Sequence, residues 1–131
     1  MKLEHSISKP ISLVADYLFD MEQFAKVHPV IYRVENLGEN QYKVYEKLPV
    51  FPLPFTYFVT LFPSLDRRSI VMKANVKGLA RIDLSFYLSE NEGITKVEEI
   101  VTFTTYLPIV FVMKTIFAKI HKQLFENIER M

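Results

Sequence analysis

The C-terminal segment, Pro108 to Met131, has the hydrophobic pattern of a long amphipathic helix. Its apolar side chains recur at steps of three and four residues, at Ile109, Met113, Ile116, Phe117, Ile120, Leu124 and Ile128. From Ile116 to Ile128 the pattern predicts an ordinary packed helix with its charged residues facing water. From Ile109 to Met113 the segment is apolar nearly all round. A helix of this length requires a large apolar surface, which the upstream chain must supply.

The first thirty residues predict a strand and two helices. Lys2–Ser8 alternates, with its apolar positions and His5 on one face. Pro10 begins a helix, where its missing N–H costs nothing. Asp20 is expected to cap a second short helix, which the His28-Pro29 pair ends.

After Pro29 the hydrophobic period changes from 3.6 to 2, which is typical of strands. The predicted strands are Val30–Asn36, Gln41–Leu48, Phe55–Phe62, Arg68–Val76, Leu79–Glu90 and Thr95–Thr104. Short connections, which hold all three glycines of the chain, predict antiparallel hairpins. The sequence therefore predicts an α+β fold in one domain, residues 1–131, with helices on one face of a meander.

Composition excludes several classes of function. The chain has 131 residues, a net charge of +1 and no cysteine, which argues against nucleic-acid binding and excludes disulfides and thiolate metal sites. His5, His28 and His121 lie in distant segments without metal-ligand spacing, so we expect no metal and no cofactor. The polar N-terminus and the absence of a long apolar run predict a soluble cytoplasmic protein.

The opening of the chain resembles a known superfamily. The strand ending in Ile7 is followed by a helix start, a capped second helix and a closing proline, at Pro10, Val14, Leu18, Asp20, Phe24 and Pro29. With the order of all later elements, this succession resembles the helix-grip superfamily of START domains and birch-pollen-allergen-like proteins. The same superfamily is called SRPBCC in bacteria and includes polyketide cyclase/dehydrase-like proteins.

The resemblance implies a curved antiparallel sheet wrapped around the C-terminal helix, with a cavity between them. Members bind lipids, sterols, polyketides, quinones or plant hormones, and some are cyclases or dehydratases. They share no catalytic motif, so the resemblance carries over no catalytic residue. We expect residues of the strands, of the proline-rich loop and of the first turns of the C-terminal helix to line the cavity. They are Phe51, Phe55, Tyr57, Met72, Leu84, Phe86, Val101, Phe103, Ile109, Met113 and Phe117.

A second unusual feature is the apolar, proline-rich loop between Leu48 and Phe58. Its prolines exclude a central strand over 49–54. One interpretation is that the loop covers the start of the C-terminal helix. Another is that it forms an apolar lip around a cavity mouth, which admits a ligand or touches a membrane. A dimer interface is a third.

Three residues are weak candidates for acid–base chemistry. Glu46 and Glu99 interrupt apolar alternation, so each is a buried carboxylate if its strand face points inward. A shift of one residue in phase would instead place each in water. His121 flanks the apolar face of the helix and has the position of a boundary histidine.

We therefore expect a binder or carrier of a hydrophobic small molecule, such as a lipid, quinone or polyketide-like ring, rather than an enzyme. One alternative is a cyclase or dehydratase that uses Glu46, Glu99 or His121. Another is an interaction module whose apolar lip docks a protein or a second copy. The sequence leaves open self-association and a transient contact with a membrane.

Overall fold

The computed structural model describes residues 1–48 and 54–131. Its elements, in chain order, are β1 (Lys2–Ile7), α1 (Ile11–Leu18), α2 (Met21–Val27), β2 (Ile31–Gly38), β3 (Gln41–Glu46), β4 (Phe55–Pro63), β5 (Ser69–Val76), β6 (Ala80–Asn91), β7 (Ile94–Thr104) and α3 (Val110–Glu129). The predicted order of strands and helices is confirmed. The predicted cap is also present, because the Asp20 carboxylate accepts a hydrogen bond of 3.0 Å from the Glu22 N–H.

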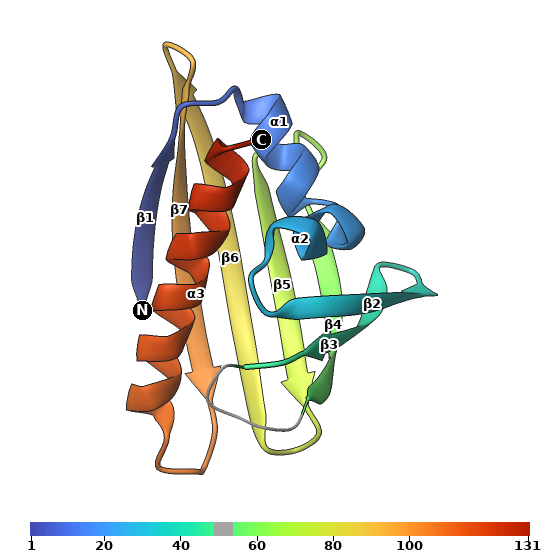
Figure 1. Cartoon of the computed structure of the whole chain (residues 1–131). Coiled ribbons are helices and arrows are strands. Elements are labelled where there is room, and N and C mark those ends of the chain that lie inside the picture. The colour runs from blue at the N-terminus through green and yellow to red at the C-terminus, as the bar shows by residue number, and fades with distance from the viewer. Residues whose placement is uncertain (49–53) are drawn as a thin grey trace.

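The strands form one antiparallel sheet in the order β1-β7-β6-β5-β4-β3-β2. Strands β2 to β7 follow one another as a meander, and β1 joins the far edge beside β7. The sheet curves around α3, while α1 and α2 cover it near the C-terminal end of that helix (Figure 1). The three helices thus lie on one side of the sheet, as predicted.

The inward face of the sheet follows the predicted alternation. Ile70 pairs with Phe86 and Met72 pairs with Leu84, so the apolar positions of β5 and β6 share one face. Glycine is required in the turn between these strands, because Gly78 has a φ of 73°.

The packed core lies at one end of the molecule. There α1, α2 and the second half of α3 bury their apolar faces against the sheet, through residues such as Val14, Leu18, Met21, Leu124 and Ile128. Within α3, all of which is described, no residue before His121 is buried. The prediction of a packed helix from Ile116 onward therefore holds only in part for the turn 116–120. Phe117 packs against the core, but Ile116 and Ile120 are only half-buried.

No helix among residues 1–48 and 54–131 combines the length and the apolar character that crossing a bilayer requires.

Candidate functional site: a cavity between sheet and helix

A cavity of about 570 Å³ separates the first half of α3 from the curved sheet. Its lining comes from α2, from strands β2 to β7 and from α3, so elements from most of the chain meet around it. Of the lining residues that the structure describes, all but four have purely apolar side chains, and the four are His28, Glu46, Tyr57 and His121. The cavity has the size and character of a pocket for a small apolar molecule.

The structure brings most of the expected lining residues together. Phe55, Tyr57, Met72, Leu84, Phe103, Ile109, Met113 and Phe117 line the cavity. Phe86 and Val101 do not line it; both are almost completely buried in the packed core, where the second half of α3 meets the sheet. Phe51 lies outside the described residues.

Sequence reasoning missed the contribution of the second helix. Met21, Phe24, His28 and Ile31 line the cavity from α2 and the start of β2. The apolar face of α2 was visible in the sequence, but its position over the cavity depends on how the chain turns after Val27.

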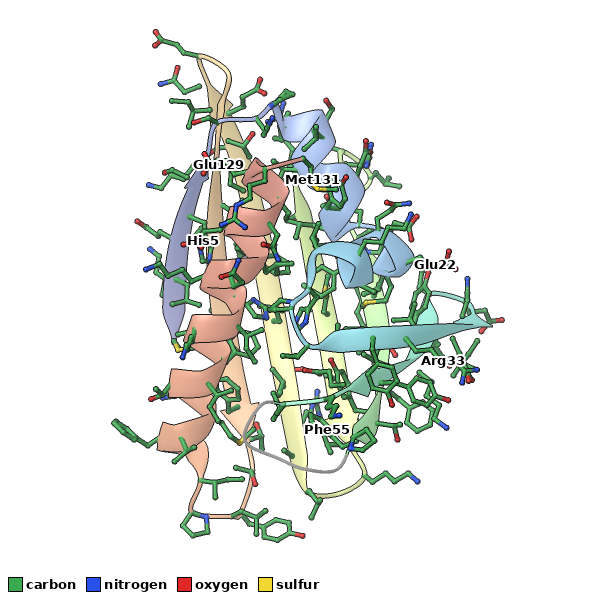
Figure 2. The ribbon with its side chains drawn as sticks, viewed as in Figure 1. His5, Glu22, Arg33, Phe55, Glu129 and Met131 are labelled. Carbon is green, nitrogen blue, oxygen red and sulfur yellow. The ribbon has the colours of Figure 1, made fainter. Side chains whose placement is uncertain are left out.

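A buried cluster of one carboxylate and two imidazoles closes the inner end of the cavity. Glu99 on β7 is 0% exposed, and its Oε1 lies 3.0 Å from the His5 Nε2. Its Oε2 lies 2.5 Å from the Nδ1 of His121. The rings are held by aromatic contacts, since His5 stacks on Phe125 with ring centroids 4.0 Å apart. Figure 2 shows His5 on β1 beside α3.

The two imidazoles decide the charge of Glu99. Burial alone would raise the pKa of this carboxyl, but His121 and His5 more than offset that effect and lower the pKa below its usual value. Glu99 is therefore ionised at neutral pH. The interpretation that a shift in phase places Glu99 in water is therefore wrong. The interpretation of His121 as a boundary histidine is also wrong, because this residue is 3% exposed and paired with Glu99.

Glu46 is the second buried carboxylate, and it lies apart from this cluster. It is 9% exposed and shares the inward face of β3 and β4 with Tyr57, its diagonal neighbour across the two strands. Burial raises the pKa of Glu46 to about 7, against the smaller opposite effect of the Tyr57 hydroxyl beside it. Burial and the neighbouring Glu46 raise the pKa of Tyr57 well above its usual value. The interpretation that a shift in phase places Glu46 in water is therefore wrong.

His28 links α2 to the cavity wall. Its Nδ1 accepts hydrogen bonds of 3.3 Å from the backbone N–H groups of Val30 and Ile31, which fixes the ring at the start of β2. Its ring centroid lies 5.8 Å from that of His121, with the two rings nearly perpendicular. Burial, and to a smaller extent His121, lower the pKa of His28 well below its usual value, so this imidazole is neutral.

Solved structures show the same architecture over nearly the whole chain. A conserved protein of Geobacillus kaustophilus matches with a TM-score of 0.81 at 10% identity, over 98% of this chain and 91% of its own. A START superfamily protein of Mycobacterium smegmatis matches with a TM-score of 0.77 at 11% identity, over 98% and 93%. This chain has the START-like helix-grip fold.

The helix-grip fold also occurs in the di-domain ARO/CYC StfQ from the steffimycin biosynthetic pathway. StfQ matches with a TM-score of 0.78 at 12% identity, over 99% of this chain and 44% of its own. No family model and no curated protein matches this sequence. At such identities the likeness establishes the fold, and the function has to be argued from the cavity itself.

The mouth of the helix-grip cavity lies at the N-terminal end of α3. Leu79, Ile109 and Val112 line the cavity and are also 51%, 40% and 54% exposed, so they form its rim. Tyr106 and Phe111 extend this apolar surface into solvent, at 79% and 83% exposure. We call these five residues the rim. The turn between β5 and β6, the loop before α3 and the first turn of α3 lie at the same end of the molecule (Figure 1).

The arrangement brings together two of the three acid–base candidates, Glu99 and His121, and keeps Glu46 separate. A carboxylate that holds one nitrogen of an imidazole leaves the other nitrogen available to a molecule in the cavity. The helix-grip cavity can therefore offer hydrogen bonds and a proton at its inner end. The described residues contain no group of three or more side chains placed to bind a metal ion.

Proposed function

We propose that this protein binds a hydrophobic small molecule in the cavity between the sheet and α3. The observation that carries the proposal is a volume of about 570 Å³ whose described lining is apolar at all but four residues. A space of this size in an interior that otherwise packs closely is costly when empty, since its walls lose their contacts. A bound apolar molecule would restore those contacts.

The chemistry of the fold's neighbours is consistent with this proposal. The similar structures include a protein named as a START superfamily member and one named as an ARO/CYC of a biosynthetic pathway. We infer for this chain only the coarse property of taking up an apolar molecule. The rim of the cavity and its four polar lining residues bear on how a ligand enters and which chemical groups it carries.

The test is a saturable binding assay with a matched pair of variants. Ala74 lines the cavity on β5, and its neighbour Asn75 is exposed on the opposite face of the sheet. Ala74→Phe fills part of the cavity, so we expect it to weaken binding of the apolar dye N-phenyl-1-naphthylamine at least tenfold. Asn75→Phe adds the same side chain outside and should change binding less than twofold. Circular dichroism checks that both variants are folded.

Native mass spectrometry of the protein as purified, followed by solvent extraction, would identify a co-purified ligand. The proposal fails if the wild-type protein shows no saturable dye site and carries no small molecule.

We further propose that the rim contacts a membrane surface when a ligand enters or leaves. Its exposed apolar side chains are accompanied by the exposed basic residues Lys77 and Lys114, and no acidic residue occurs between Glu99 and Glu126. Apolar groups beside lysines suit the surface of an anionic bilayer.

Flotation with vesicles of phosphatidylcholine and phosphatidylglycerol tests this contact. We expect Phe111→Ser to reduce binding several-fold. Leu65→Ser is the control, because Leu65 is fully exposed in the β4–β5 loop, where Arg67 pairs with Asp16 of α1 at the other end of the molecule. Equal binding of the two variants would contradict a role for the rim.

A further inference from the structure

Each of two histidines at the inner end of the cavity has one nitrogen without a hydrogen-bond partner among residues 1–48 and 54–131. His28 and His121 both line the cavity, and their ring centroids lie 5.8 Å apart. In each ring the Nδ1 atom is engaged by the protein: in His28 by two backbone N–H groups, and in His121 by the Glu99 carboxylate. The Nε2 atom of each ring is the one left for a molecule in the cavity.

Through its Nε2 atom, His28 can donate a hydrogen bond but cannot accept one. Its Nδ1 accepts hydrogen bonds from Val30 and Ile31, so Nδ1 carries no hydrogen. A neutral imidazole has one N–H, which must then be on Nε2. The backbone thus fixes the tautomer of His28 and makes it a hydrogen-bond donor toward the cavity.

His121 can also donate a hydrogen bond through its Nε2, for an electrostatic reason. Glu99 is completely buried, and an ionised carboxylate in that position needs a compensating positive charge. The nearest nitrogen is His121 Nδ1, at 2.5 Å. If His121 supplies that charge as an imidazolium, it carries N–H on both nitrogens and its Nε2 also donates.

We propose that His28 and His121 form a paired donor site for one acceptor oxygen of the ligand, which is therefore an apolar molecule with a carbonyl group at its inner end. A neutral carbonyl fits better than a carboxylate, since Glu46 already places an acidic group in the cavity wall and the Glu99 carboxylate lies directly against His121. The inference rests on the proposed function, because it assigns the head group of the molecule that the cavity binds.

The geometry also sets the direction and length of that molecule. Phe111 is at the mouth and His121 is ten residues later on the same helix, a distance of about 15 Å at 1.5 Å per residue. The carbonyl would lie at the level of His121, and the apolar body would extend along α3 toward the rim.

The test compares two probes of similar shape, 2-methyl-1,4-naphthoquinone, which has carbonyl groups, and 2-methylnaphthalene, which has none. The chain contains no cysteine, so the quinone cannot be captured by a thiol. Affinities are measured by displacement of N-phenyl-1-naphthylamine, and the quantity of interest is the ratio of the two affinities. Because the hydrocarbon reports changes in packing, the ratio isolates the hydrogen bonds.

His28→Asn and His121→Asn are the informative variants. In each, the amide group of asparagine replaces Nδ1, so it can still accept from Val30 and Ile31 or donate to Glu99, while Nε2 is lost. We expect each variant to lower the quinone-to-hydrocarbon ratio about fivefold, the effect of one hydrogen bond. His5→Gln is the matched control, since the glutamine amide replaces the Nε2 atom that contacts Glu99 and His5 does not line the cavity, so the ratio should stay within twofold.

Each outcome has a separate meaning. A ratio that falls in both cavity variants and not in His5→Gln supports the donor pair. A ratio that stays within twofold of the wild-type value in either cavity variant, with both probes still binding, overturns the pair and leaves the proposed function intact. If neither probe displaces the dye, or the dye itself finds no saturable site, the proposed function fails and the head-group inference fails with it.

Discussion

The two halves of α3 lie along the same sheet, but they face different interiors. From His121 to Ile128 the helix is in direct contact with the core, and His121, Leu124, Phe125 and Ile128 are buried. From Val110 to Ile120 it borders the cavity, and none of its residues is buried. One continuous helix therefore serves both as a structural element and as a wall of the binding site.

The buried carboxylates differ in the same way. Glu99, in the packed half, is surrounded by His5 and His121, and its pKa is lowered. Glu46, in the wall of the cavity, has the Tyr57 hydroxyl beside it, and burial raises its pKa to about 7. Burial is similar in the two positions, so the neighbouring imidazoles decide whether the pKa of the carboxyl is raised or lowered. Beside the packed half of α3, the imidazoles stabilise the charged form of Glu99. In the cavity wall, burial favours the neutral form of Glu46.

The largest effect is expected from breaking the buried cluster. Glu99→Ala removes the partner of two imidazoles and leaves space in the core, so the free energy of unfolding should fall by about 4 kcal/mol at pH 7. Urea denaturation followed by circular dichroism measures it.

Glu98→Ala is the control on the same strand, one residue away and on the opposite face. Glu98 is partly exposed and pairs with Lys2 at the surface, at 3.2 Å, so its removal should cost less than about 1 kcal/mol. Equal losses in the two variants would show that the Glu99 cluster contributes no more than a surface pair.

A matched pair of isoleucines tests the two halves of α3 directly. Ile128 is 0% exposed in the packed half, and Ile128→Ala should cost about 3 kcal/mol. Ile116 lines the cavity and is only half-buried, so Ile116→Ala removes fewer contacts and should cost less than half as much. The same urea experiment measures both, and similar losses would mean that the helix is packed evenly along its length.

The sequence predicted the elements well because each depends on local pattern. The change of period after Pro29 marked the strands, and the side-chain spacing marked α3. The division of α3 was placed too early because Ile116, Phe117 and Ile120 have the same pattern whether they pack against a sheet or border a cavity. The gap between sheet and helix depends on the curvature of the whole sheet, which no single segment encodes.

The acid–base residues show a similar limit. Alternation identified Glu46 and Glu99 as exceptions, but their inward phase needed the register of the neighbouring strands. The pairing of Glu99 with His5 and His121 joins β1, β7 and α3, which are adjacent only in the folded chain. His28 gave no signal, because its function as a donor depends on the two backbone N–H groups that fix its tautomer.

A pH experiment distinguishes the carboxyl in the cavity wall, Glu46, from the carboxyl in the packed region, Glu99. The folded-state pKa of Glu46, about 7, is above its ordinary value of 4.5. The contribution of this carboxyl to stability is therefore fully present below pH 4.5 and is lost as the pH rises through 7. The total loss is as much as about 3 kcal/mol, from 1.36 kcal/mol for each pKa unit.

Glu46→Gln removes this ionisation, so its stability relative to the wild-type protein should rise between pH 4.5 and 8. Glu99 has the opposite sign, because its lowered pKa makes its contribution present above pH 4.5 and lost in more acidic solution. Urea titrations at several pH values measure the difference between variant and wild type. A difference that does not change with pH would show that Glu46 titrates normally.

The smallest effect concerns local opening of α3. The first half of the helix has few contacts with the sheet, so its amide hydrogens should exchange about tenfold faster than those of residues 121–128, equivalent to about 1.4 kcal/mol of local stability. Hydrogen exchange with mass spectrometry resolves the two halves. Saturation with N-phenyl-1-naphthylamine should slow exchange in residues 110–120 and leave 121–128 unchanged, because a ligand stabilises the segment that it contacts. Uniform protection along α3, with and without the dye, would contradict the division of the helix, since a cavity wall that is already rigid gains nothing from being filled.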